Sequence, residues 1–178
     1  RVLEEHYDSL KKLADFLVGK AEGDIITEGL GDHMEPQADG VSHFTPNHTP
    51  PSLTSTAYHF YNTWITSQVA EILGKSEDAE YYSDQANKIK NSFNREFFDE
   101  NANNYATGSQ TSNALPLYLG LVPEGREEAV LKNLVDDIMI TNHKHLSTGI
   151  IGTDALENVL PKYGRADVMY ELATQTTL

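Results

Sequence analysis

The stretch Leu73-Gly74-Lys75-Ser76 separates two long helical patterns. Residues 54–73 and 77–97 both carry apolar side chains at helical spacing. Gly74 ends the first helix and Ser76 caps the second, whose first turn contains two acidic residues, as the helix dipole favours. Because the turn is so short, the two helices are predicted to form an antiparallel hairpin. The residues expected to face the core are Tyr58, Tyr61, Ile65, Val69 and Ile72 in the first helix and Ala79, Tyr82, Ala86, Ile89, Phe93 and Phe97 in the second.

The rest of the chain also favours helices, so the predicted fold class is all-α. Strand-like alternation is nearly absent, apart from a brief extended segment at 24–27. Pro116 should shift or kink the later turn of one short helix, and Pro123 suits the first turn of the next. The further helices are predicted at 2–19, 109–119, 123–139, 153–160 and 164–175. Their expected faces include Val2, His6, Leu10, Leu13 and Leu17 in the first, and Val130, Leu134 and Ile138 in the third.

Composition limits the possible functions. The 178 residues suffice for a domain with a core. A net charge of −14 argues against nucleic acid or an anionic membrane as partner, since both require basic patches, and suits a neutral substrate. The chain has no cysteine, which excludes thiolate catalysis, disulfides and cysteine-bound zinc. No apolar run is long enough to span a membrane. These features leave the compartment open; a periplasmic or extracellular place is expected for the full-length protein.

The loop Glu28–Pro36 concentrates the groups that site chemistry needs: two glycines, three carboxylates and a histidine. The polar arm Gln37–Ser52 follows, and its histidine and proline content favours an ordered loop that lines a cleft. Asp32 and Glu35 are too close in sequence for a pair that acts across a sugar bond. Asp32 is instead suited to accept hydrogen bonds from sugar hydroxyls. The alternatives are a solvated acidic loop or an aspartate that caps a local turn.

Other polar and aromatic residues leave two interpretations open. His33, His43 and His145 could hydrogen-bond a polar ligand or cap loops, and their spacing matches no zinc signature, so no metal is expected. The aromatic residues at 58–64 could stack on a sugar ring or pack in the core, and for Tyr61 core packing is favoured. No Gly-x-Ser-x-Gly motif is present, which argues against a serine hydrolase.

Several segments together resemble the catalytic domain of bacterial α-L-rhamnosidases, which are six-hairpin glycosidases. They follow the family's order and cover nearly the whole chain. The matching segments are Gly29-Leu30-Gly31-Asp32, Thr49-Pro50-Pro51, residues 53–58, Ala70-Glu71-Ile72-Leu73-Gly74, Phe93-Asn94-Arg95-Glu96-Phe97, Tyr105, Gly108-Ser109-Gln110-Thr111, Ala114-Leu115-Pro116-Leu117, Gly120-Leu121-Val122-Pro123 and residues 145–153.

The resemblance implies helical hairpins that form part of an (α/α)6 barrel, and an inverting two-carboxylate hydrolase of terminal α-L-rhamnosyl residues without a cofactor. The motifs that carry the family's general acid and general base are absent. Residues 1–178 are therefore expected to form a partial barrel domain truncated at both ends, with no catalytic residue and no activity of its own. A half barrel would also leave apolar helix faces that favour self-association.

The resemblance further implies that Asp32, His33 and His145 bind the substrate, a rhamnose-containing carbohydrate. One departure concerns His33, which stands where the family usually has tryptophan; it puts in question the sugar-stacking role of that position, and strict rhamnose specificity with it. Two alternatives remain. One is a non-catalytic helical carbohydrate-binding or scaffolding module. The other is a different (α/α)-barrel enzyme, such as a lyase, against which the acidic charge argues.

Overall fold

The computed structural model describes residues 1–36 and 46–176. Its helices are α1 (Val2–Lys20), α2 (Pro51–Ile72), α3 (Ser76–Phe97), α4 (Gln110–Leu119), α5 (Glu127–Asp136), α6 (Ile150–Lys162) and α7 (Ala166–Ala173). The π-helical turn η1 (Asp137–Thr141) extends α5. A two-residue antiparallel ladder pairs β1 (Phe98–Asp99) with β2 (Asn104–Tyr105). The all-α fold class is confirmed, and His43 lies outside the described residues.

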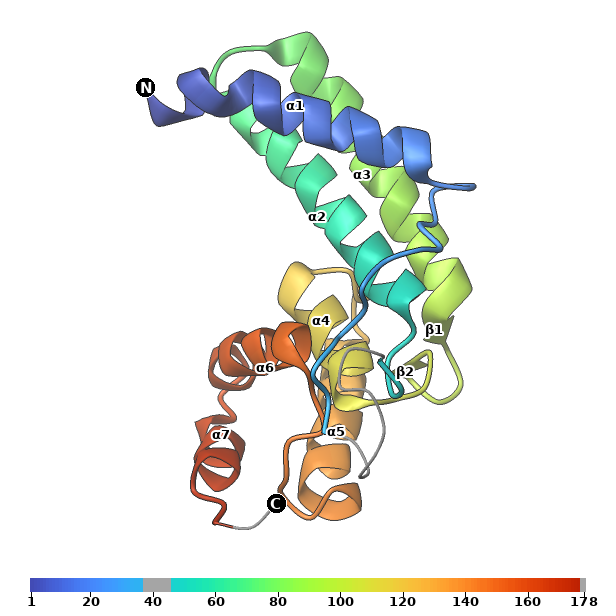
Figure 1. Cartoon of the computed structure of the whole chain (residues 1–178), viewed down its shortest axis with the longest axis vertical. Coiled ribbons are helices and arrows are strands. Elements are labelled where there is room, and N and C mark those ends of the chain that lie inside the picture. The colour runs from blue at the N-terminus through green and yellow to red at the C-terminus, as the bar shows by residue number, and fades with distance from the viewer. Residues whose placement is uncertain (37–45, 177–178) are drawn as a thin grey trace.

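The helices form hairpins arranged around α4. Helices α2 and α3 pair along their length, as predicted from the short turn at Gly74, whose φ is +70°. Helix α4 packs against α2, α5 and α6, and α7 folds back on α6. Figure 1 shows the consequence: α1, α2 and α3 form one elongated group, and α4 connects it to the α6–α7 pair. The row α2–α4–α6 is thus continuous, and α3, α5 and α7 each pair with one of its members.

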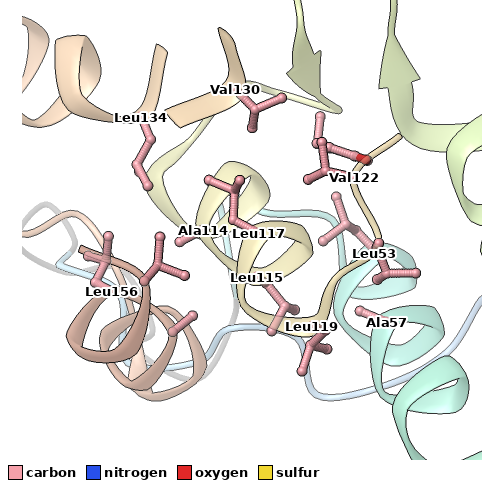
Figure 2. Close-up of a cluster of buried hydrophobic side chains, with 14 of the residues drawn as sticks. Leu53, Ala57, Ala114, Leu115, Leu117, Leu119, Val122, Val130, Leu134 and Leu156 are labelled. Atoms are coloured by element: carbon pink, nitrogen blue, oxygen red, sulfur yellow. The ribbon is translucent and has the colours of Figure 1, made fainter. Parts of the chain in front are cut away.

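The main core lies where this row meets its outer partners. Leu53, Leu115, Leu134 and Leu156, which come from α2, α4, α5 and α6, are each 0% exposed and belong to one cluster (Figure 2). A second, small cluster holds Tyr7 of α1 against Val69 and Ala70 of α2. Most apolar burial of this chain is therefore centred on α4, and α1 lies at the edge.

The expected inward faces are confirmed for some helices and wrong for others. All three expected residues of α5 and η1 are 0% exposed, and Tyr82, Ala86, Ile89 and Phe93 of α3 are buried. Ile72 is 70% exposed, so its assignment to the α2 face was wrong. The α1 face was wrong in part: Val2, His6 and Leu13 are exposed, whereas Leu10 and Leu17 are half-buried beside the buried Tyr7 and Ala14. Apolar spacing marks a stripe on a helix, but only tertiary neighbours decide whether it is covered.

Several helix ends also differ from the sequence prediction. Helix α2 begins at Pro51 instead of residue 54, because proline is favourable in a first turn, where its missing N–H costs no hydrogen bond. Residues 123–126 form a turn instead of the start of α5, and Gly125 there has φ +79°. Helix α4 ends at Leu119, as predicted, with Pro116 inside it. Helix α6 starts at Ile150, three residues before the predicted start, for a reason that lies in the loop around Asp32.

Candidate functional site

The carboxylate of Asp32 is the most heavily bonded group in the loop Glu28–Pro36. The residue is 0% exposed. Its Oδ1 accepts hydrogen bonds from the backbone N–H groups of Ile151 (2.8 Å) and Gly152 (3.1 Å). Its Oδ2 accepts the N–H of Gly149 (2.9 Å) and the hydroxyl of Thr111. Asp32 therefore caps the start of α6 from a distant part of the sequence, where a negative charge also complements the helix dipole.

Two glycines make this close approach possible. A Cβ atom at Gly149 would lie 2.1 Å from the carbonyl oxygen of His33 and 2.7 Å from Asp32 Oδ1. A Cβ atom at Gly152 would lie 1.9 Å from Thr111 Oγ1 and 2.7 Å from Asp32 Oδ2. Any larger residue would push the first turn of α6 away from the loop. These contacts explain why α6 begins earlier than local sequence signals suggest.

Gln110, which precedes Thr111 in α4, holds the loop that contains His145 and Ser147. Gln110 is 0% exposed, and its Nε2 donates to the carbonyl oxygen of His145 at 3.0 Å. Its Oε1 accepts the N–H of Ser147 at 3.1 Å. Gln110 thus connects the start of α4 to the first half of the loop 145–152, and Thr111 reaches its second half through Asp32. Neither residue was among the predicted site residues, although their segment was part of the family resemblance.

Glu35 also accepts hydrogen bonds from backbone N–H groups, which belong to the later part of the polar arm. It is 0% exposed, and its Oε2 accepts the N–H groups of Asn47 (2.7 Å) and His48 (2.9 Å). The carbonyl oxygen of His48 accepts a hydrogen bond from the hydroxyl of Thr107 at 2.5 Å. The two buried carboxylates of this loop are therefore both engaged by backbone groups. They cap backbone, as one of the sequence alternatives proposed, but they reach distant segments instead of a local turn.

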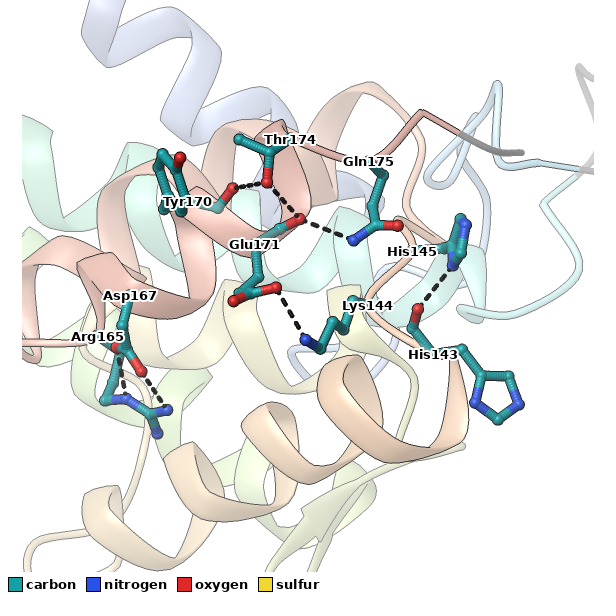
Figure 3. A network of polar contacts seen from close by, with 9 residues as sticks. All are labelled: His143, Lys144, His145, Arg165, Asp167, Tyr170, Glu171, Thr174 and Gln175. Atoms are coloured by element: carbon teal, nitrogen blue, oxygen red, sulfur yellow. Dashed lines mark hydrogen bonds and ion pairs between the residues drawn. The ribbon is translucent and has the colours of Figure 1, made fainter.

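The two candidate histidines differ in their surroundings. His33 is half-buried; its carbonyl oxygen accepts the N–H of Ile150 at 3.1 Å, and its buried Nδ1 has no hydrogen-bond partner among the described residues. His145 is also half-buried, and its Nδ1 lies 2.8 Å from the carbonyl oxygen of His143. Figure 3 shows this contact beside the ion pair that ties Lys144 to Glu171 of α7 at 2.9 Å. The loop is thus anchored to both α4 and α7.

A cavity of about 360 Å³ opens between α1, the segment around His33 and α2. It combines apolar walls with polar groups from Thr54, Ser55, Tyr58 and Asn62. His59 also lines it; burial lowers the pKa of this imidazole to about 4, and its buried Nδ1 has no hydrogen-bond partner in residues 1–36 and 46–176. Two imidazoles therefore line one pocket of mixed polarity, a combination suited to a small neutral molecule with hydroxyl groups.

The aromatic residues of α2 have separate environments. Tyr58 lines the cavity, and burial raises the pKa of its hydroxyl, with the charge of Asp154 adding to the effect. Tyr61 is half-buried against the main core, which confirms core packing. Trp64 is 42% exposed and stacks on Tyr61 with ring centroids 6.0 Å apart. Of these three residues, Tyr58 is the one that reaches the cavity.

One polar residue near the loop was missed by the sequence analysis. Asp137 lies in η1, where burial raises the pKa of its carboxyl and hydrogen bonds from Gln110 and Asn142 oppose the shift. The Nδ2 atom of Asn142 donates to Asp137 Oδ2 at 2.8 Å. A π-helical turn has no reliable sequence signal, so this placement could not be predicted. Within the described residues, no three metal-binding side chains gather at one point, and no helix is long and apolar enough to cross a membrane.

Comparison with known families gives one match over the whole chain. Residues 1–178 match the model of the bacterial alpha-L-rhamnosidase six-hairpin glycosidase domain. An α-L-rhamnosidase of Formosa agariphila is 30% identical over 181 residues, covering 99% of this chain and 19% of that protein. One from Alteromonas sp. (strain LOR) is 31% identical over 182 residues, covering 99% of this chain and 20% of that protein. The chain thus spans about a fifth of the length of these curated relatives.

Solved structures agree with this match. The α-L-rhamnosidase from Dictyoglumus thermophilum superposes with a TM-score of 0.90 at 41% identity, covering 99% of this chain and 20% of that one. The Streptomyces avermitilis α-L-rhamnosidase in complex with L-rhamnose gives a TM-score of 0.85 at 28% identity, covering 99% of this chain and 16% of that one. The hairpin arrangement around α4 is therefore also found in larger glycosidases.

Proposed function

This chain belongs to the bacterial α-L-rhamnosidase six-hairpin glycosidase family, and we propose that the complete protein hydrolyses terminal α-L-rhamnosyl groups from carbohydrates. The observation that carries the proposal is the family match across all of residues 1–178. The mixed cavity beside His33 supports it, because L-rhamnose combines hydroxyl groups with an apolar methyl group. The net charge of −14 is also compatible with a neutral substrate.

Within this proposal, His33 and His145 contribute polar contacts to the sugar. His33 lines the cavity. His145 lies on the loop that Gln110 holds in place. The residues 1–178 form part of an (α/α)6 barrel, and other segments of the protein complete the site.

The proposed mechanism inverts the anomeric centre with two carboxylates that lie outside residues 1–178. The environments of Asp32 and Glu35 support this placement. Each is 0% exposed and accepts at least two backbone N–H groups. A general acid or base must reach the proton that it transfers, and neither of these two buried carboxylates lines the cavity. Neither has the access to solvent that activation of a water molecule requires.

The test is hydrolysis of an aryl α-L-rhamnoside by the full-length protein, followed by proton NMR. We expect the β-anomer of rhamnose to appear first, as inversion requires, with turnover in the ordinary range of about 1–10³ per second. Residues 1–178 alone should show no turnover. Initial release of the α-anomer would contradict the inverting mechanism, and ordinary turnover by residues 1–178 would contradict the placement of the carboxylates.

A non-catalytic carbohydrate-binding module is the second candidate, and the engagement of both buried carboxylates in this chain favours it over catalysis within residues 1–178. It predicts that the full-length protein binds rhamnose in calorimetry and leaves every aryl rhamnoside intact. Hydrolysis would eliminate this candidate.

A further inference from the structure

We propose that Asp32 is a positioning residue for the proposed rhamnosidase reaction, which fixes His33 and Ile151 as one wall of the cavity without touching the sugar. The expected effect of Asp32 on the rate of hydrolysis rests on the proposed function. Its role in holding the start of α6 does not depend on that function. The carboxylate lies between the two wall residues, and it is bonded to the backbone on the Ile151 side. It replaces the direct contact with sugar hydroxyls that the sequence favours for Asp32.

A sugar in the cavity has no free access to the Asp32 carboxylate. Gly31 and His33 both line the cavity, whereas Asp32 does not, and Asp32 is 0% exposed. Each of its oxygens already accepts two hydrogen bonds from protein donors. A sugar hydroxyl would have to displace one of these donors. The carboxylate thus does not line the cavity whose wall it supports.

Removal of the Asp32 carboxylate would leave backbone N–H groups at the start of α6 without an acceptor. Gly149, Ile151 and Gly152 would lose the acceptor of their N–H groups at the start of α6, where no helical partner exists for them. Orphaned buried donors carry a large desolvation cost. The turn would have to open or rotate, and Ile151 would move with it. Asp32 therefore sets the position of a cavity residue through the backbone.

The contact between the Asp32 loop and the start of α6 also fixes the backbone of His33. Its carbonyl oxygen accepts the N–H of Ile150, and Gly149 lies so close that a Cβ atom there would be 2.1 Å from that oxygen. The backbone at His33 and the backbone of the first turn of α6 are therefore held in a fixed position relative to each other. The hydroxyl of Thr111 in α4 adds to this arrangement by donating a hydrogen bond to the Asp32 carboxylate. A shift of α6 would be transmitted directly to His33.

The activity test uses four variants of the full-length protein. Asp32→Asn removes one acceptor and turns an amide toward backbone donors, and kcat/KM for an aryl α-L-rhamnoside should fall about 10- to 150-fold, with both limbs of the pH–rate profile retained. Thr111→Val should reduce kcat/KM about 2- to 13-fold, and Thr111→Ser should restore it. Ile89→Ala, in the α2–α3 core, is the stability control; it should lower Tm and leave kcat/KM within about twofold in the folded protein.

A second readout does not depend on activity. Hydrogen exchange of the amides at 149–152 in the full-length protein should accelerate at least about tenfold in Asp32→Asn and remain unchanged in Ile89→Ala. Unchanged exchange in Asp32→Asn would overturn the positioning role, whether or not the protein hydrolyses rhamnosides. Faster exchange with kcat/KM within twofold of the wild type would reduce Asp32 to a structural residue. The loss of a pH limb would make it an acid or base and also overturn the proposal. Inactivity of the wild-type protein with faster exchange in the variant would count against the proposed function alone.

Discussion

Helices α4 and α1 have opposite environments in the same chain. Nine of the ten residues of α4 are buried, and Tyr118 alone is half-exposed. Of the 19 residues of α1, only Tyr7 and Ala14 are buried, and Phe16 is 58% exposed. Helix α4 is enclosed by α2, α5 and α6, whereas α1 packs mainly on α2. A helix can thus form over the predicted residues while several of its large apolar side chains stay exposed among residues 1–36 and 46–176.

The largest expected effect would come from truncating a side chain in α4. Leu115 is 0% exposed, and Leu115→Ala should lower the free energy of unfolding by about 2–5 kcal/mol, because it removes buried methyl groups and leaves a cavity. Leu13 of α1 is 43% exposed, and Leu13→Ala should change the free energy of unfolding by no more than about 0.5 kcal/mol. Urea denaturation of residues 1–178 measures both. Equal losses for the two variants would remove the contrast between the helices.

A second prediction concerns His59 in α2, the helix that lies between α1 and α4. Burial lowers the pKa of its imidazole to about 4 from an ordinary value of 6.5. As the pH falls below 6.5, the unfolded chain takes up a proton and the folded chain does not, so stability is lost between pH 6.5 and 4. The loss should approach about 3 kcal/mol.

The variant His59→Gln should remove this part of the pH dependence, and His6→Gln, at an exposed position of α1, serves as the control. The measurement is the difference in free energy of unfolding between each variant and the wild type from pH 7 to pH 4. Because carboxylates titrate in the same range, only the difference reports on His59. If His59→Gln kept the wild-type slope, the imidazole would not be held neutral.

The smallest energetic effect is expected on the open face of α1, where association should respond more than stability. Residues 1–178 should self-associate through the exposed side chains of α1, and Phe16→Ser should increase the monomer fraction in light scattering. Its effect on the free energy of unfolding should stay within about 0.5 kcal/mol. Tyr170→Ser, at a 69% exposed aromatic residue of α7, is the matched control. A wild-type monomer that binds no dye specific for apolar surface would contradict this prediction.

The same contrast separates what the sequence could predict from what it could not. Gly74, whose φ is +70°, lies next to the end of α2, so the α2–α3 hairpin could be recognised from a local signal. Ser76 was wrongly predicted as the cap of α3: it is the first residue of the helix, after Lys75 at the N-cap, and its side chain makes no capping hydrogen bond. The start of α6 depends on Asp32, which is 117 residues before Gly149. No local pattern encodes that distance. The sequence could therefore show that the loop Glu28–Pro36 was chemically unusual, but not that its carboxylates cap other segments.

The bond between Asp32 and the start of α6 also has a consequence for the time at which the site can form. The loop around Asp32 is synthesised before its partner at Gly149, 117 residues later in the chain. At about 5–20 residues per second, the ribosome takes roughly 6–23 s to cover that interval. During this time the carboxylate is hydrated and keeps the nascent loop compatible with water. We expect this wall of the cavity to be among the last parts of the segment to become ordered, because its closing contact has so long a sequence separation.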